Sequence, residues 1–189
     1  MAAEGCCVGV VMRAAWPRTL GFLVCALLLA ASLGGTSEAR RHGAPAATGL
    51  KNVAYAKPPP DFSFDLGTGP ERLRDLVGKP VVINFWATWC KPCRDELDAF
   101  AKLHERYGPA VTLLTIASQP RGVASSFLQQ HNLSDALPLF EDDQRLVSEA
   151  YSIGDLPATI VLKRDGTVAS VMIGQARWED LETAVDAVL

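Results

Sequence analysis

The feature that most constrains this chain is a pair of cysteines two residues apart, Cys90 and Cys93. An apolar run, Val81–Trp86, comes shortly before the pair, and a stretch with helical periodicity, residues 94–106, follows it directly. A Cys-x-x-Cys pair between a buried strand and a helix is typical of a redox-active disulfide, whereas zinc sites commonly combine two such pairs. The sequence therefore predicts an α/β fold that carries a thiol–disulfide centre.

The position at a helix start gives the first cysteine its reactivity. Free N–H groups and the positive dipole end of a helix stabilise a thiolate. They lower a cysteine pKa from about 8.5 toward about 3.5–7.5, so Cys90 is predicted to be the nucleophile. Cys93, one turn further in, is predicted to be the resolving thiol, which releases the mixed disulfide. An inert structural disulfide is the alternative, but closing so short a loop gains little entropy.

Composition argues against two other classes of protein. The net charge of −3 offers no basic surface for nucleic acid. Three of the five cysteines, Cys6, Cys7 and Cys25, lie in the N-terminal segment, which leaves only the pair in the folded part. A structural zinc site usually has four ligands, and His104 and His131 do not complete one by their spacing. Neither a metal nor a cofactor is therefore expected.

Residues 1–39 have the pattern of an export signal. Arg13 and Arg18 precede an uncharged, mostly apolar run over residues 19–37, and small residues then allow cleavage after Ala39. The run is also just long enough to cross a bilayer core of about 30 Å, so an uncut membrane anchor is the alternative. Both interpretations place the folded part outside the cytoplasm, in the periplasm or at the outer face of the cytoplasmic membrane.

The rest of the chain divides into a linker and one domain. Residues 40–59 are rich in Ala, Gly and Pro and predict an extended linker, and residues 60–189 predict the domain. Apolar patterns and turn signals predict strands over 62–66, 81–86, 111–117, 137–140, 158–163 and 168–173, and helices over 71–77, 94–107, 123–131, 144–151 and 178–189. Alternating elements followed by a final hairpin indicate a mixed central sheet flanked by helices.

Two motifs resemble a known family. Residues 84–96 read Asn-Phe-Trp-Ala-Thr-Trp-Cys-Lys-Pro-Cys-Arg-Asp-Glu, and residues 151–159 read Tyr-Ser-Ile-Gly-Asp-Leu-Pro-Ala-Thr. With them, residues 58–189 resemble the thioredoxin-fold proteins of the TlpA/ResA/CcmG type. The resemblance implies a thioredoxin fold with an extra N-terminal strand and a central β/α insertion, here residues 111–146.

The resemblance also suggests roles for Glu96 and Pro157. Glu96 matches an acid near the active site of these proteins and follows Cys93 by three residues, on the same helix face. If it is buried, its pKa should rise, and it could exchange a proton with the thiols; a solvated helix residue is the alternative. Pro157 matches the cis-proline that faces the cysteines, with an ordinary turn proline as the alternative. Asn84 stands where thioredoxin has a buried aspartate and cannot titrate, which strengthens the case for Glu96 as the proton carrier; a hydrogen-bonded polar strand residue is the alternative for Asn84.

Five residues are expected to form the groove on which a partner docks. The backbone of Leu156 would pair with an extended substrate segment. Asp155 replaces a glycine that is common in the family and adds a negative charge. Trp89 offers an apolar rim. Lys91 and Pro92 lie between the cysteines, where the lysine would favour the thiolate.

The resemblance thus predicts an extracytoplasmic thiol-disulfide oxidoreductase that reduces disulfides in partner proteins such as apocytochrome c or copper-site proteins. A membrane thiol reductase of the CcdA/DsbD type would return its cysteines to the reduced state. One alternative is an oxidant that forms disulfides in secreted proteins. Another is a copper chaperone, which the spacing disfavours because related copper carriers use Cys-x-x-x-Cys and a distant histidine.

Overall fold

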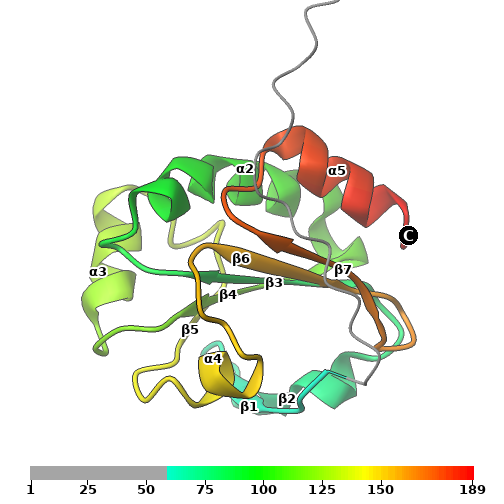
Figure 1. Ribbon diagram of the computed structural model, residues 1–189, viewed down its shortest axis with the longest axis horizontal. Coiled ribbons are helices and arrows are strands. Elements are labelled where there is room, and N and C mark those ends of the chain that lie inside the picture. The colour runs from blue at the N-terminus through cyan, green and yellow to red at the C-terminus, as the bar shows by residue number, and fades with distance from the viewer. Residues whose placement is uncertain (1–58) are drawn as a thin grey trace, which may run out of the picture. The chain divides into compact units, whose positions relative to one another are not determined.

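The computed structural model describes residues 59–189, whose centre is a five-stranded mixed sheet in the order β5-β4-β3-β6-β7 (Figure 1). Strands β3, β4 and β5 run parallel, whereas β6 pairs antiparallel with β3, and β7 with β6. This arrangement confirms the predicted mixed sheet. The strands are β3 (Val81–Trp86), β4 (Thr112–Ala117), β5 (Leu139–Glu141), β6 (Ala158–Leu162) and β7 (Val168–Ile173).

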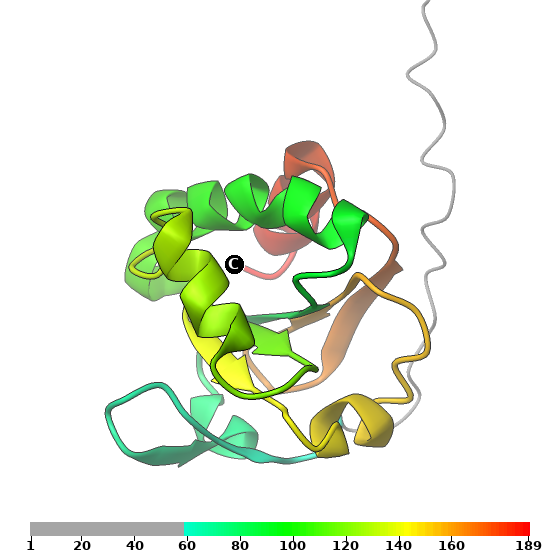
Figure 2. The same cartoon turned by 90° about the vertical axis from the view of Figure 1, so that its left-hand side faces the viewer.

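Helices cover both faces of the sheet, which explains why its central strands are apolar without alternation. Every residue of β3 and β6 is buried. Val82 and Trp86 of β3 belong to the core beneath three of the helices, whereas Ile83 and Phe85 belong to the core on the other face. Figure 2 shows the two layers, in which α2 (Lys91–Tyr107), α3 (Val123–Gln130) and α5 (Trp178–Asp186) lie on one face and α4 (Leu146–Ala150) on the other.

The N-terminal strand forms as predicted, but it pairs with a different partner. Strand β1 (Ser63–Asp65) does not join the edge of the central sheet but pairs antiparallel with a strand that was not predicted, β2 (Pro70–Arg72). The Asp65 carboxylate accepts hydrogen bonds from the N–H groups of Gly67 and Gly69, at 2.7 and 3.1 Å. Both glycines have positive φ, so the chain turns back within a few residues.

The other boundaries follow the predictions to within a few residues. The predicted helix over 71–77 is a short 3-10 turn, η1 (Leu73–Leu76), and a second such turn, η2 (Gly108–Ala110), follows α2. The predicted central insertion folds as β4, α3 and β5. No helix among residues 59–189 is long and apolar enough to cross a bilayer. The predicted export segment, residues 1–39, and all but the last residue of the predicted linker lie outside the described residues.

Candidate active site

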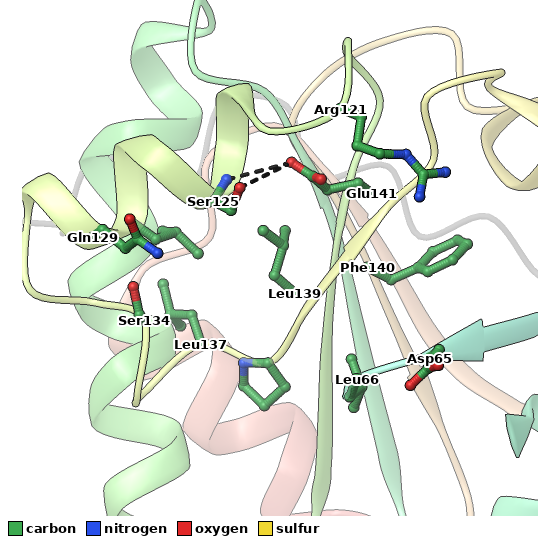
Figure 3. A pocket seen from close by; sticks show the side chains of 12 residues that line it. Asp65, Leu66, Arg121, Ser125, Gln129, Ser134, Leu137, Leu139, Phe140 and Glu141 are labelled. Carbon is green, nitrogen blue, oxygen red and sulfur yellow. Dashed lines mark hydrogen bonds between the residues drawn. The ribbon is translucent and has the colours of Figure 1, made fainter. Parts of the chain in front are cut away.

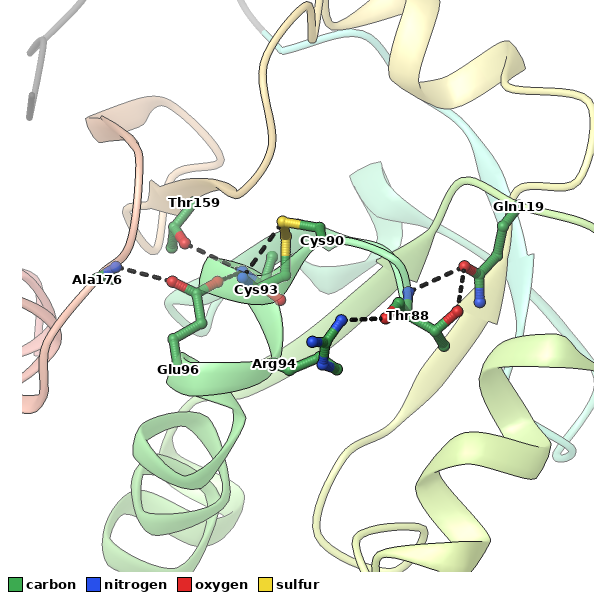
Figure 4. Close-up of a disulfide and its surroundings, with 9 residues drawn as sticks. Thr88, Cys90, Cys93, Arg94, Glu96, Gln119, Thr159 and Ala176 are labelled. Carbon is green, nitrogen blue, oxygen red and sulfur yellow. Dashed lines mark hydrogen bonds between the residues drawn. A yellow bond between two sulfur atoms is a disulfide. The ribbon is translucent and has the colours of Figure 1, made fainter.

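The two cysteines form a disulfide at the start of α2 (Figure 4). Their sulfur atoms are 2.05 Å apart. The helix begins at Lys91, three residues earlier than its predicted start, because Cys90 itself is the N-cap and Pro92 occupies the first turn, where its missing N–H costs no helical bond. The N–H of Cys93 donates to Cys90 Sγ at 3.3 Å, so a helix N–H group points at this sulfur.

The two cysteines differ in how much of their surface is accessible to solvent. Cys90 keeps 6% of its surface accessible and Cys93 keeps none. Trp89 is 66% exposed, and Lys91 and Pro92 are exposed as well, so the neighbours of Cys90 in sequence lie on the surface. A partner can therefore reach the first sulfur but not the second, which agrees with the order of attack predicted from the motif.

The loop before the disulfide is held from two sides. The N–H and Oγ1 of Thr88 donate to Gln119 Oε1 at 3.0 and 3.1 Å, and Arg94 Nη1 donates to the carbonyl of Thr88 at 2.6 Å. Gln119 follows β4, whereas Arg94 lies in the first turn of α2. The segment that carries Trp89 and Cys90 is thus fixed to both elements, and no sequence pattern had marked Gln119 or Arg94 for this task.

Glu96 is buried, with 1% of its surface accessible. Its Oε1 accepts a hydrogen bond from Asn84 Nδ2 at 2.8 Å, and its Oε2 accepts one from the N–H of Ala176 at 2.7 Å. Burial raises the pKa of Glu96 from 4.5 to about 8, although both hydrogen bonds oppose the rise. The carboxyl group therefore titrates close to neutral pH, which general acid–base chemistry requires. The alternative considered from the sequence, that Glu96 is a solvated helix residue, is therefore wrong.

The partners of Glu96 come from three distant parts of the chain. Asn84 lies in β3, and its Nδ2 also donates to Thr159 Oγ1 of β6 at 3.3 Å. Ala176 lies between β7 and α5. Sequence analysis noted Asn84 as a non-titrating replacement but missed its bond to Glu96. A backbone donor such as that of Ala176 leaves no mark in a sequence.

The raised pKa of Glu96 predicts how stability depends on pH. Between pH 4.5 and about 8 the folded protein holds a proton on Glu96 that the unfolded chain has lost. The contribution of Glu96 to stability should thus be greatest below pH 4.5, fall as the pH rises to about 8, and then level off, with an upper limit of about 5 kcal/mol for the loss. Denaturant unfolding of the wild type and of Glu96→Gln across this range measures the effect. The variant should lack this component of the slope, and equal slopes would contradict the assignment.

The peptide bond between Leu156 and Pro157 is cis, as the resemblance predicted. Pro157 is buried, and its carbonyl accepts the N–H of Gly174 at 2.8 Å. The backbone of Leu156 makes no hydrogen bond within residues 59–189. Its N–H and C=O groups therefore remain available for an extended segment, as strand addition requires.

Three of the five predicted groove residues line one hollow of about 250 Å³, namely Trp89, Asp155 and Leu156. Lys91 and Pro92 lie beside the disulfide but not in this hollow. The ammonium group of Lys91 pairs with the carboxylate of Asp95, four residues along α2. The hollow is completed by Ser118, Arg145, Ser148, Ile153 and Gly154.

A larger hollow of about 430 Å³ lies between α3 and the edge strand β5, remote from the cysteines in sequence (Figure 3). Glu141 in its wall accepts hydrogen bonds from the N–H groups of Gly122 and Ser125, at the start of α3. Neither cysteine and none of the predicted groove residues contributes to its lining. This hollow therefore has no part in the disulfide site.

Comparison with known proteins decides the family. The model of the AhpC/TSA family matches residues 56–171, which is more than half of the chain. The chain belongs to this family. The thiol-disulfide oxidoreductase ResA of Geobacillus kaustophilus is 33% identical over 139 residues, which cover 72% of this chain and 79% of that protein. Within the family, the chain is thus a thiol-disulfide oxidoreductase of the ResA type, and the predicted redox centre is confirmed at this level.

Solved structures of similar proteins have the same thioredoxin-like fold. A secreted disulfide oxidoreductase of Mycobacterium tuberculosis, homologous to Escherichia coli DsbE, has a TM-score of 0.58 and 28% identity, over 67% of this chain and 95% of that one. A DsbF homologue from Corynebacterium diphtheriae has a TM-score of 0.61 and 23% identity, over 76% of this chain and 96% of that one. The predicted thioredoxin fold is thereby confirmed.

Proposed function

We propose that this oxidoreductase works outside the cytoplasm as a reductant of disulfides in partner proteins, with apocytochrome c and copper-site proteins as candidate partners. The N-terminal segment, residues 1–39, would export the domain or anchor it to the membrane, and residues 40–59 would link it. A membrane thiol reductase of the CcdA/DsbD type would reduce its disulfide again after each turnover. The similar M. tuberculosis oxidoreductase is a secreted protein, which supports this location.

In the first step, the thiolate of Cys90 attacks one sulfur of the partner's disulfide. The partner's S–S bond breaks, a mixed disulfide forms, and the partner's second sulfur leaves as a thiolate that takes a proton from water. The small accessible surface that Cys90 keeps, and Cys93 lacks, supports this order. So does the free backbone of Leu156, because the segment that carries the partner's cysteine can pair beside Pro157.

In the second step, Cys93 passes its proton to the Glu96 carboxylate and attacks Cys90 Sγ. The enzyme disulfide forms, and the partner leaves as a second thiolate, which is protonated by water. Two electrons have then moved from the enzyme to the partner. Glu96 suits this role because it follows Cys93 on the same helix face, is buried, and has a pKa of about 8.

The observation that supports the reducing direction is electrostatic. A strongly oxidising centre needs a stabilised thiolate in its reduced form. Here the side chain of Lys91 is engaged by Asp95, and within residues 59–189 the hydrogen bond to Cys90 Sγ comes from Cys93 N–H alone. The additional acid Asp155 lines the same hollow as Trp89, the residue before Cys90, and a negative charge nearby would disfavour a negative sulfur. The disulfide should therefore be difficult to reduce and the dithiol a good reductant.

The test is the reduction potential, measured by equilibration with a thioredoxin or glutathione couple of known potential. We expect a value near that of thioredoxin, about −270 mV. A value near that of DsbA, about −120 mV, together with net oxidation of reduced unfolded protein, would identify a disulfide-forming oxidant instead. Stoichiometric copper retention that is lost in Cys90→Ser would identify a copper chaperone.

A further inference from the structure

The side-chain amide of Asn84 is the group on which the buried acid depends. Its Nδ2 bonds both Glu96 Oε1, at 2.8 Å, and Thr159 Oγ1, at 3.3 Å. Its Oδ1 is buried and has no hydrogen-bond partner within residues 59–189. The amide is thus held at its nitrogen end alone, although an asparagine can present either a donor or an acceptor to a neighbour.

The observed orientation fits the ionised form of Glu96. A carboxylate only accepts hydrogen bonds, and here each of its oxygens receives an N–H group, from Asn84 and Ala176. A protonated carboxyl group carries an O–H that needs an acceptor. The N–H of Ala176 belongs to the backbone and cannot become one. On the Oε1 side, an O–H directed along the present hydrogen bond would meet the NH₂ group of Asn84, donor against donor.

A half-turn of the Asn84 amide removes this conflict. Oδ1 then occupies the position of Nδ2, within reach of Glu96 Oε1 and of Thr159 Oγ1. A carbonyl oxygen has two lone pairs and can accept from both. The hydroxyl of Thr159, which accepts from the amide in the present arrangement, can equally donate to it.

We propose that Asn84 is a positioning residue whose amide turns over as Glu96 gains and loses its proton, with Thr159 adapting as acceptor or donor. This inference rests on the proposed role of Glu96 as the proton carrier. The buried acid is then hydrogen-bonded in both protonation states. The rotation of one side chain supplies the acceptor that the protonated form needs, so the backbone does not have to move. Asn84 touches neither substrate nor sulfur in this scheme and acts through Glu96.

The groups that face Glu96 keep the proton exchange local. They are the amide of Asn84 from β3, the hydroxyl of Thr159 close behind it from β6 and the backbone of Ala176 before α5, with Cys93 three residues earlier on its own helix. Within residues 59–189, Glu96 forms no ion pair with any lysine, arginine or histidine. Once the disulfide is reduced, the Cys93 thiol on the same helix is thus the titratable neighbour to which the network can respond.

Nuclear magnetic resonance on the isotope-labelled protein tests this directly. The Glu96 side-chain carboxyl carbon reports its titration, and nuclear Overhauser effects report whether the Asn84 NH₂ group lies beside the Thr159 methyl group. We expect the contact between NH₂ and Thr159 at high pH and its loss on the acid side of the Glu96 titration. In Glu96→Gln, whose neutral amide can donate to Asn84 Oδ1, the acid-side pattern should persist at every pH. An Asn84 amide whose contacts stay constant through the titration would overturn the proposal.

Substitutions provide a second readout. Asn84→Leu, of similar size, should move the Glu96 titration midpoint upward because the carboxylate loses a donor. Thr159→Val should reduce the pH-dependent change of the Asn84 NH₂ resonances, whereas Thr159→Ser, which keeps the hydroxyl, should retain that change in full. Equal behaviour of the valine and serine variants would contradict the role of Thr159. Since these measurements need no partner protein, they separate this inference from the proposed direction of electron flow.

Discussion

Cys90→Ser should reduce disulfide exchange to the uncatalysed background rate. A serine hydroxyl is not ionised near neutral pH, and Cys93 cannot replace the lost thiolate because it has no accessible surface. The measurement is the rate at which the pre-reduced protein cleaves a disulfide-linked peptide pair, followed by the appearance of free peptide thiol. A fall of the exchange rate to the uncatalysed background is the largest effect that the site predicts.

The control for this result is the stability of the variant relative to the reduced wild type. Neither protein contains the disulfide and a serine differs from a cysteine by one atom, so the two proteins should unfold at similar denaturant concentrations. If Cys90→Ser still cleaves the peptide pair at an appreciable rate, Cys93 is the attacking thiol and the two roles are reversed.

Glu96→Gln should slow the resolving step by about 10²- to 10⁴-fold, the usual contribution of a positioned acid or base. In the wild type this step should accelerate as the pH rises through about 8, because Glu96 must be ionised to take the proton of Cys93. The glutamine cannot titrate, so the inflection should disappear. Single-turnover release of a partner peptide from the preformed mixed disulfide, recorded from pH 5 to 9, isolates this step.

Glu105→Gln is the matched control, because Glu105 lies on the same helix, is exposed, and undergoes the same chemical change. It should leave both the rate and the inflection in place. An unchanged pH profile in Glu96→Gln would remove Glu96 from proton transfer and leave it as a buried structural acid.

The redox centre was predictable because its determinants are local in sequence. A strand, two cysteines and a helix follow one another within residues 81–107, so spacing alone places Cys90 at a helix N-terminus. The cis peptide bond before Pro157 was also foreseen, but only through the resemblance, since composition and periodicity do not distinguish a cis-proline from a turn proline. The central strands were predictable because a sheet that is buried on both faces requires continuous apolar runs.

The environment of Glu96 could not be predicted because it is assembled from distant parts of the chain. Glu96 and Ala176 are 80 positions apart, and the chain between them includes four strands, β4 to β7, and the helices α3 and α4. Its burial and pKa follow from how α2 packs on β3, β6 and the chain before α5, which no local pattern encodes. The pairing of β1 with β2 was missed for a different reason, since Pro70–Arg72 is too short and too polar to read as a strand.

The most direct test of the central claim is to trap the intermediate with Cys93→Ser. The reduced variant is mixed with a disulfide-linked peptide pair, the products are alkylated, and the site of attachment is located by mass spectrometry. The account predicts a stable mixed disulfide between the peptide and Cys90, one per protein molecule, which only added thiol discharges. A variant that releases the peptide as fast as the wild type, or that forms no adduct at Cys90, would contradict it.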